Sequence, residues 1–287
     1  MSDSHTTTSP RLLVLGGPDS GKTTYRTQLY QRIEHEHGEM CLLKSIEDMT
    51  ALEGDVERIV RGLQPLHTAS NTYHSTTFSV EDRAKRHLTL EFADYDGEQI
   101  RRVGESNALP TQWLTRAKES RCWLFFLRID DMRPAKSFIT DPVETGPRPE
   151  AKDSGSHSER SAELNAVEIL QRLLFIRGAS LRHPLSSPRL GVVLSCWDEL
   201  SASEIKLSPT AILEKRAPLF SRFIHANWVA RELKVWGLSS TGRKLPEKEP
   251  DLEFAREGPE KFGYVVLENG KTDTDLTIPI GWLMPRD

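Results

Sequence analysis

The sequence predicts a three-layer α/β domain with a mostly parallel sheet, and three observations indicate it. Short apolar runs that are typical of buried strands alternate with stretches whose apolar residues recur at helical spacing. A glycine-rich turn joins the first apolar run to the first helical stretch. One pair of runs alternates with a period of two around a polar turn, which predicts a hairpin that adds one antiparallel edge strand.

The individual elements follow from the same patterns. Strands are expected at residues 11–15, 123–129, 190–195, 233–238 and 264–267, with the hairpin at 76–92. Helices are expected at residues 22–37, 45–63 and 161–177. The first helix should end at Gly38, because glycine is favoured just after a helix. Another helix should begin at Ser208 and Pro209, and Pro218 should divide that region in two.

The sequence also predicts how the chain is organised. Residues 1–10 are polar and rich in Ser and Thr, so we expect a disordered amino-terminal segment. Residues 11–287 should form a single domain, in which the helix at 45–63 is an addition. Residues 131–160 contain four prolines among polar residues, which predicts a long flexible insertion at the surface.

Composition excludes several classes of protein. A formal net charge of −4 gives no electrostatic reason to expect a nucleic acid or an anionic membrane as partner. The longest strongly apolar run, residues 122–127, is too short for a membrane helix. Cys41, Cys122 and Cys196 lie far apart, which suits a reducing compartment and argues against a structural metal site. We expect a cytoplasmic protein.

The glycine-rich turn has the pattern of a phosphate-binding loop, in which two glycines, Gly16 and Gly21, are separated by four residues and followed by Lys and Thr. Phosphate oxygens need several converging backbone N–H donors, and a glycine-rich turn that opens a helix supplies them. Lys22 should neutralise the β- and γ-phosphates, and the Thr23 hydroxyl should ligate Mg²⁺. The residues expected to bind nucleotide are Gly17, Pro18, Asp19, Ser20, Gly21, Lys22, Thr23 and Thr24.

An acidic residue ends the second arm of the predicted hairpin. Asp94 is followed by Gly97 and Glu98 in the string DYDGE. An acid at a strand end beside the phosphate loop can hold Mg²⁺ through water. Gly97 can offer a backbone N–H to the γ-phosphate without interference from a Cβ atom. We therefore interpret Asp94 as a metal-positioning residue, although a polar turn has the same composition.

Two further strand ends indicate selection of a guanine base. Asp198, after the strand that ends at Ser195, can accept hydrogen bonds from both N1–H and N2–H of guanine, which adenine cannot donate. Ser239 and Ser240 follow the last strand of the parallel sheet, where a loop of small residues can direct a backbone N–H at guanine O6. Open α/β sheets bind ligands at the carboxyl ends of their strands, where all these residues fall.

The order of these motifs resembles the GTPase superclass, and strings near both ends resemble the bacterial double-GTPase group of the TRAFAC class. The strings are LQPLHT at residues 63–68, LSCWD at 194–198, GYVV at 263–266 and DLTIPI at 275–280. The resemblance covers about residues 11–284. It implies a Ras-like P-loop NTPase fold and a bacterial GTPase, often encoded beside partner proteins in systems suspected of anti-phage conflict.

The resemblance also implies roles for individual residues, and the chain departs from the family pattern at two of them. The base motif usually has Lys where Cys196 stands, and Ras-like proteins have a water-positioning Gln where Glu98 stands. The threonine that senses the γ-phosphate and Mg²⁺ matches Thr68 in the family string, whereas Ras-like spacing matches Thr72; we favour Thr68. Thr68, Lys22 and Glu98 are the expected catalytic residues.

The sequence therefore predicts a Mg²⁺-dependent GTPase that hydrolyses GTP slowly and acts as a nucleotide-state switch. Residues 65–76 and 97–110 should report the bound nucleotide, GTP or GDP, to a protein partner. Two other classes stay open: a GTP-binding interaction module with little hydrolysis, and an ATP-using P-loop enzyme that would not need Asp198.

Overall fold

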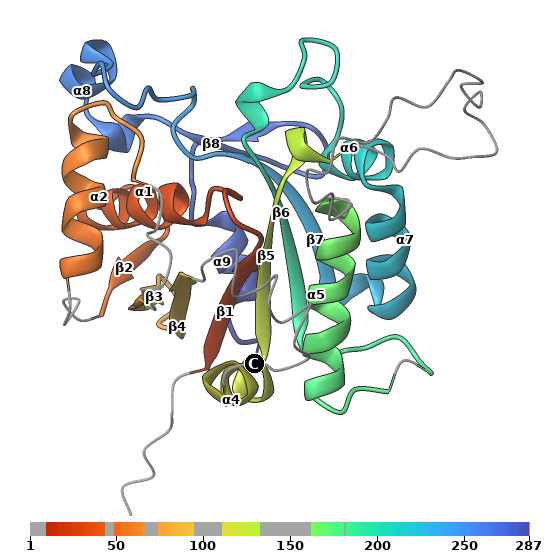
Figure 1. Ribbon diagram of the computed structural model, residues 1–287. Helices are drawn as coiled ribbons and strands as arrows, with labels where there is room; N and C mark the ends of the chain where they lie inside the picture. Colours follow the sequence, from red (N-terminus) through yellow and green to blue (C-terminus); the bar gives the residue numbers. More distant parts are fainter. Residues whose placement is uncertain are drawn as a thin grey trace, which may run out of the picture.

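The computed structural model describes residues 10–43, 49–66, 74–94, 111–132, 162–180 and 182–286. The strands of this part of the chain form one nine-stranded sheet in the order β2-β3-β4-β1-β5-β6-β7-β8-β9. Its central strands run parallel and are β4 (His87–Asp94), β1 (Arg11–Gly16), β5 (Cys122–Arg128), β6 (Arg189–Ser195) and β7 (Leu233–Ser239). The sheet lies between helices on both faces (Figure 1), so the predicted three-layer α/β fold is confirmed.

Both edges of the sheet are antiparallel. The predicted hairpin consists of β3 (His74–Asp82) and β4, but β3 is not the edge, because the short strand β2 (Met40–Leu42) pairs with its outer side. At the opposite edge β8 (Tyr264–Val266) pairs with β7, and β9 (Thr272–Asp273) pairs with β8. The expectation of one antiparallel edge strand was therefore too simple. The strand expected at 264–267 is β8, whereas β2 and β9, with three and two residues, are too short to show a period of two in the sequence.

The helices form the two outer layers. On one face lie α1 (Lys22–Glu34), α2 (Thr50–Val60) and α9 (Ile278–Leu283), and on the other lie α4 (Thr111–Glu119), α5 (Ala162–Ile176), α6 (Pro209–Arg216) and α7 (Pro218–Asn227). Phe254 of α8 (Leu252–Glu257) packs against Ile59 of α2. Short 3-10 turns are η1 (Ile129–Asp131), η2 (Trp197–Glu199), η3 (Ala230–Glu232) and η4 (Pro259–Lys261).

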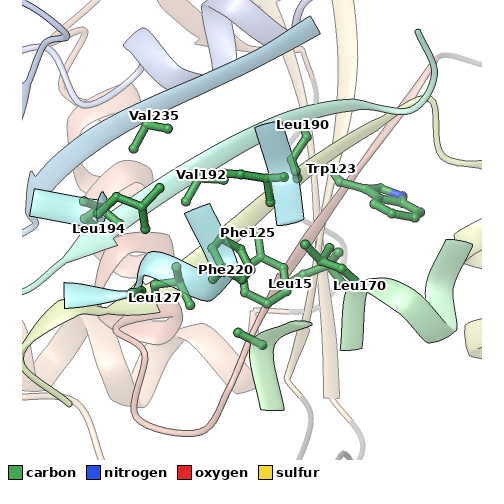
Figure 2. Close-up of a cluster of buried hydrophobic side chains, with 14 of the residues drawn as sticks. Leu15, Trp123, Phe125, Leu127, Leu170, Leu190, Val192, Leu194, Phe220 and Val235 are labelled. Atoms are coloured by element: carbon green, nitrogen blue, oxygen red, sulfur yellow. The ribbon is translucent and has the colours of Figure 1, made fainter. Parts of the chain in front are cut away.

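Alternate residues of each central strand enter different cores. In β5, Trp123 and Phe125 face the α5 side, while Leu124 and Phe126 face the α1 side. Figure 2 shows Phe125 against Phe220 of α7, with a ring-centroid distance of 5.5 Å. Because both faces are covered, β5 is apolar without a break from Cys122 to Leu127, as the sequence indicated.

Helix boundaries agree with the sequence at α6 and α7 but not at α1 and α2; α2 begins at Thr50 and ends at Val60, against the expected 45–63. Ser208 accepts a hydrogen bond from the Ala211 N–H at 3.3 Å and caps α6, and α7 begins at Pro218, as expected. In contrast α1 ends at Glu34, three residues before the expected end. Gly38 has φ +124°, and a Cβ atom there would lie 2.6 Å from Asp275 Oδ1. Gly38 thus allows a close approach of the later chain and does not end α1.

Part of the expected organisation lies outside the described residues. This applies to residues 1–9, to residues 44–48 of the helix expected at 45–63, and to the insertion expected at 131–160 apart from Asp131 and Met132. The single domain over residues 11–287 stays a prediction, which the single sheet supports.

Helix α1 is held by polar contacts with a distant part of the chain. The Tyr25 hydroxyl donates to the Leu276 carbonyl at 2.9 Å, and burial raises the pKa of that hydroxyl. Gln28 Nε2 donates to the carbonyls of Pro259 and Phe262. The Arg32 guanidinium donates to the carbonyl of Thr274 at 2.6 Å and to those of Phe262 and Gly263. These contacts fix the helix that follows the glycine-rich loop, and we name residues 259–276 the clamp segment.

Helix α7 is capped by an acidic residue from another helix. Its N-cap residue, Ala217, has no side-chain acceptor, but Glu163 of α5 accepts from the N–H groups of Leu219 at 2.6 Å and Phe220 at 3.1 Å. Glu163 is 2% exposed, so water cannot replace it easily. A negative charge at this position is also attracted to the positive end of the helix dipole, which stabilises the helix.

We expect Glu163→Ala to lower the free energy of unfolding by about 1–3 kcal/mol, because two buried N–H groups lose their acceptor. Urea denaturation measures the change. Glu168→Ala on the same helix is the matched control, since it removes a partly exposed surface pair with Arg172 worth about 0.5 kcal/mol. Equal stability losses in the two variants would show that Glu163 does not cap α7.

Candidate functional site

The glycine-rich loop lies between the carboxyl end of β1 and the start of α1. Its backbone requires glycine at two points. Gly16 has φ +147°, and a Cβ atom there would lie 2.6 Å from the Phe126 carbonyl oxygen; Gly21, at the N-cap of α1, has φ +79°. Asp19 also has a positive φ, of 53°. The first turn of α1 carries no acidic side chain, so its N–H groups and positive end are suited to an anion.

Lys22 is folded into the loop that precedes it. Its ammonium group donates to the carbonyls of Gly16 at 3.0 Å and Gly17 at 2.6 Å and to Ser20 Oγ at 3.1 Å, and the side chain is mostly buried. Ser20 Oγ in turn donates to the Gly17 carbonyl at 2.8 Å. These hydrogen bonds hold a positive charge at the centre of the loop. Pro18, Thr23 and Thr24 complete the same segment, as the motif predicted.

The strand end after β6 lies against this loop. A Cβ atom on Gly21 would lie 3.4 Å from the Ser195 Cβ atom, so the two segments are in close contact. Ser195 is buried, and its hydroxyl donates to the Leu127 carbonyl of β5 at 3.1 Å. The structure thus brings the phosphate-loop motif and the base motif together at one edge of the sheet.

The turn η2 directs Asp198 away from the core. Cys196 adopts a left-handed backbone conformation with φ 56°, after which Trp197 turns inward and is fully buried. A Cβ atom on Gly237 of β7 would lie 2.3 Å from the Trp197 ring, so only glycine allows this packing. Asp198 is partly exposed. Burial raises the pKa of the Tyr264 hydroxyl, and the charge of nearby Asp198 raises it further.

The loop after β7 is also rigid. Ser239 is fully buried, and its hydroxyl accepts from the Gly242 N–H at 2.9 Å. Gly263, in the clamp segment, has φ +94°, and a Cβ atom there would lie 2.3 Å from the Ser240 carbonyl oxygen. Sequence reasoning found Ser239 and Ser240 but gave Gly263 no structural role. The glycine directly before a predicted strand was the available signal.

A charged cluster at the end of β5 was not predicted. Arg128 lies opposite Ser195 in the β5–β6 register and donates to Glu199 Oε2 at 2.5 Å. Asp131 Oδ2 lies 3.9 Å from Arg128 Nε on its other side. Burial raises the pKa of the Cys196 thiol to about 11, so the thiol is protonated at neutral pH. An arginine that ends an apolar run was the only signal in the sequence.

Of the predicted metal-positioning residues, Thr23 and Asp94 lie within the described part of the chain and Thr68 does not. β1 and β4 pair in parallel up to Val14 and Phe92, so the Asp94 backbone lies level with Gly16, beside the phosphate loop. Thr23 stands in the first turn of α1. A hydroxyl and a carboxylate are oxygen ligands of the kind that Mg²⁺ prefers, so these residues fit that ion. Thr68, Thr72, Gly97 and Glu98 lie outside the described residues.

The described part of the chain shows neither a candidate metal cluster nor a candidate membrane span. It contains no group of three or more His, Cys, Asp or Glu side chains that could hold a metal ion. Within the same residues, every helix is too short or too polar to cross a membrane.

The fold and this edge of the sheet define a GTP-binding P-loop protein of the GTPase class. A family model described as Double-GTPase 1 matches residues 13–283, and the chain belongs to that family. The suggested resemblance is thereby confirmed at the level of the family. No curated protein matches the sequence.

Similar solved structures are distant. The Arl6 (BBS3) small GTPase from Trypanosoma brucei, solved with the nucleotide analogue GppNp, is 11% identical with a TM-score of 0.38; the match covers 81% of this chain and 88% of that one. The mammalian signal recognition particle receptor is 15% identical with a TM-score of 0.39, covering 80% and 91%. The assignment rests on the family match and the topology described above.

Proposed function

We propose that the chain is a Mg²⁺-dependent GTPase that hydrolyses GTP slowly and acts as a nucleotide-state switch. One observation carries the proposal: the loop around Lys22 and the turn that presents Asp198 lie at carboxyl ends of strands in the same sheet, with Gly21 and Ser195 in contact between them. A nucleotide with its phosphates in the loop can therefore reach Asp198 with its base.

The phosphate loop would bind the β- and γ-phosphates. Residues 17–24, apart from Pro18, supply backbone N–H groups, and Lys22 supplies a charge that is already held by three oxygen atoms of its own loop. Such preorganisation matters because phosphoryl transfer depends mainly on positioning and on stabilisation of charge. Thr23 and Asp94, with Thr68, would hold Mg²⁺, which neutralises charge on the phosphates when it is bound.

The base would lie between the turn η2 and the loop after β7. Asp198 would accept from guanine N1–H and N2–H, with Ser195 supporting the turn from the phosphate-loop side. Ser239 and Ser240 would set the loop that donates to guanine O6. Adenine would leave the Asp198 carboxylate without donors, which costs more than a missing contact.

Direct titration tests the proposal. We expect the full chain to bind GTP and GDP in calorimetry, with Mg²⁺ strengthening GTP binding, and to bind ATP at least about 100-fold more weakly, the scale of discrimination that an unpaired polar group gives. Equal binding of ATP and GTP would favour an ATP-using P-loop enzyme. Absence of nucleotide binding would refute the proposal.

Hydrolysis is proposed to depend on Glu98. Because Glu98 directly follows Gly97 in the sequence, its carboxylate would lie within reach of a water that attacks the γ-phosphate, but its charge would repel the γ-oxygens. Glu98→Ala should lower single-turnover hydrolysis by roughly 10- to 100-fold, the lower range for a positioned acid–base group. GTP affinity should change little. Hydrolysis at the rate of the unmodified protein would instead favour a GTP-binding interaction module.

The switch would be read by a protein partner through residues 65–76 and 97–110, which contain Thr68 and Gly97. Loss of the γ-phosphate would release these segments. The family resemblance extends the proposal to bacterial conflict with phages. Phage plating on cells that carry the complete gene system, with and without the Lys22→Ala change, tests this part, and equal plating would refute it.

A further inference from the structure

The end of β5 lies between the two halves of the proposed nucleotide site. The sheet order places β5 between β1, which precedes the phosphate loop, and β6, which precedes Asp198. A nucleotide that spans the two motifs must therefore pass over the carboxyl end of β5. Arg128 is the last residue of that strand and lies level with Ser195 of β6.

Arg128 is held in place but not enclosed. Its guanidinium donates to Glu199 Oε2 at 2.5 Å, and Asp131 Oδ2 lies 3.9 Å from its Nε atom. Glu199 belongs to the same turn as Asp198, so the base motif itself positions the arginine. A quarter of the Arg128 side chain stays exposed. A planar group that is already oriented loses little conformational entropy when a ligand stacks on it.

Arg128 stays positively charged at this position. Burial lowers the pKa of its guanidinium, but the Cys196 sulfur, which is a thiolate at the high pH where arginine titrates, and the Glu199 carboxylate outweigh this effect and raise the pKa above its ordinary value. Cys196, a short side chain, stands where the base motif usually has a lysine whose stem covers the base. The base would therefore lack a cover from its own motif.

We propose that Arg128, oriented by Glu199, covers one face of the guanine base and replaces the lysine that Cys196 displaces. This inference rests on the proposed function, because it concerns the same site. An arginine guanidinium stacks well on a planar aromatic ring, and a cation over such a ring is attracted by its π-electrons. Arg128 is thus a base-contacting residue, whereas Glu199 is a positioning residue.

The test compares a ligand with a base and a ligand without one. Affinities for GDP and for ribose 5-diphosphate are measured by calorimetry on the full chain, with Mg²⁺ at fixed concentration. Arg128→Ala should weaken GDP binding by about 5- to 30-fold, the range for a partly desolvated cation–π contact, and leave ribose 5-diphosphate binding unchanged. Arg128→Gln, which keeps a donor for Glu199, is measured in parallel and should weaken GDP binding in the same selective way.

Two further variants make the result decisive. Arg172→Ala is the matched control, because Arg172 also pairs at 2.5 Å with a glutamate and its side chain is 22% exposed, against 25% for Arg128. It should leave both affinities unchanged. In Arg128→Ala combined with Cys196→Lys, the restored lysine should return GDP affinity to within about threefold of the unmodified protein, since a stem of that length covers the same face.

The outcomes separate this proposal from the function on which it rests. If the unmodified protein does not bind GDP, both fail. If it binds GDP and Arg128→Ala leaves the ratio of the two affinities unchanged, the proposed function stands and the role of Arg128 is refuted. Equal weakening of both ligands would also refute it, since Arg128 would then be only a structural ion pair between β5 and η2.

Discussion

Replacement of Lys22 by Ala is expected to weaken GTP binding by about 30- to 4000-fold. The ammonium group is mostly buried at the centre of the glycine-rich loop, where it donates to two backbone carbonyls and to Ser20. Phosphates bound in this loop would lose their main cation. Removing one partner of a desolvated, hydrogen-bonded charge pair costs about 2–5 kcal/mol, and each 1.4 kcal/mol is a factor of ten.

Calorimetry with GTP and with GDP measures the loss caused by the Lys22 change. Lys22→Met separates charge from packing, because it keeps an unbranched stem of similar length and should lose nearly as much affinity. Lys215→Ala is the control for removal of a lysine, since Glu204 keeps its ion pair with Arg216 at 2.7 Å. Unchanged GTP affinity in Lys22→Ala would refute the assignment of the glycine-rich loop as the phosphate-binding site.

The Asp198→Asn change should alter the choice of base. The amide oxygen can still accept from guanine N1–H, but the amide nitrogen faces the donor N2–H, so we expect GTP affinity to fall by about 30- to 1000-fold. Xanthine carries an oxygen at position 2, which the new amide can bind. Xanthosine triphosphate should therefore bind the variant better than GTP does.

Competition among GTP, xanthosine triphosphate and ATP measures this preference. The change should leave the fold intact, because Asp198 is partly exposed, while the turn depends on buried Trp197 and on Gly237. Glu214→Gln, on the exposed side of helix α6, is the control for loss of one carboxylate. If Asp198→Asn keeps the original order of preference, another residue reads the base.

Much of the fold could be predicted because apolar periodicity is a local property. The strands that contain Leu13, Phe125 and Val192 are buried on both faces, and each gives a continuous apolar run. The hairpin and the divided helix at Pro218 follow from equally local rules. Motifs at strand ends also gave the loop around Lys22 and the turn at Asp198, because parallel strands bring their carboxyl ends to one edge.

What could not be predicted depends on contacts between distant residues. Helix α1 buries Gln28 and Arg32, which look like surface residues, because carbonyls of the clamp segment accept hydrogen bonds from Gln28 Nε2 and from the Arg32 guanidinium. The sequence suggested that Gly38 ends a helix, but glycine is required there because Asp275 lies close to it. Arg128 was missed at the site for the same reason, since its place depends on pairing between β5 and β6 and on Glu199. No periodicity within a segment reports such contacts.

Because the clamp segment lies near the end of the chain, the order of protein synthesis affects when this site can form. Tyr25 and Leu276, which share a hydrogen bond, are 251 residues apart, and Gln28 and Phe262 are 234 apart. A ribosome completes the phosphate-loop sequence long before it makes these partners. Until then α1 has polar side chains without acceptors beside an apolar sheet, and the loop after β7 lacks Gly263. We therefore expect tight nucleotide binding to begin only when the clamp segment has been made.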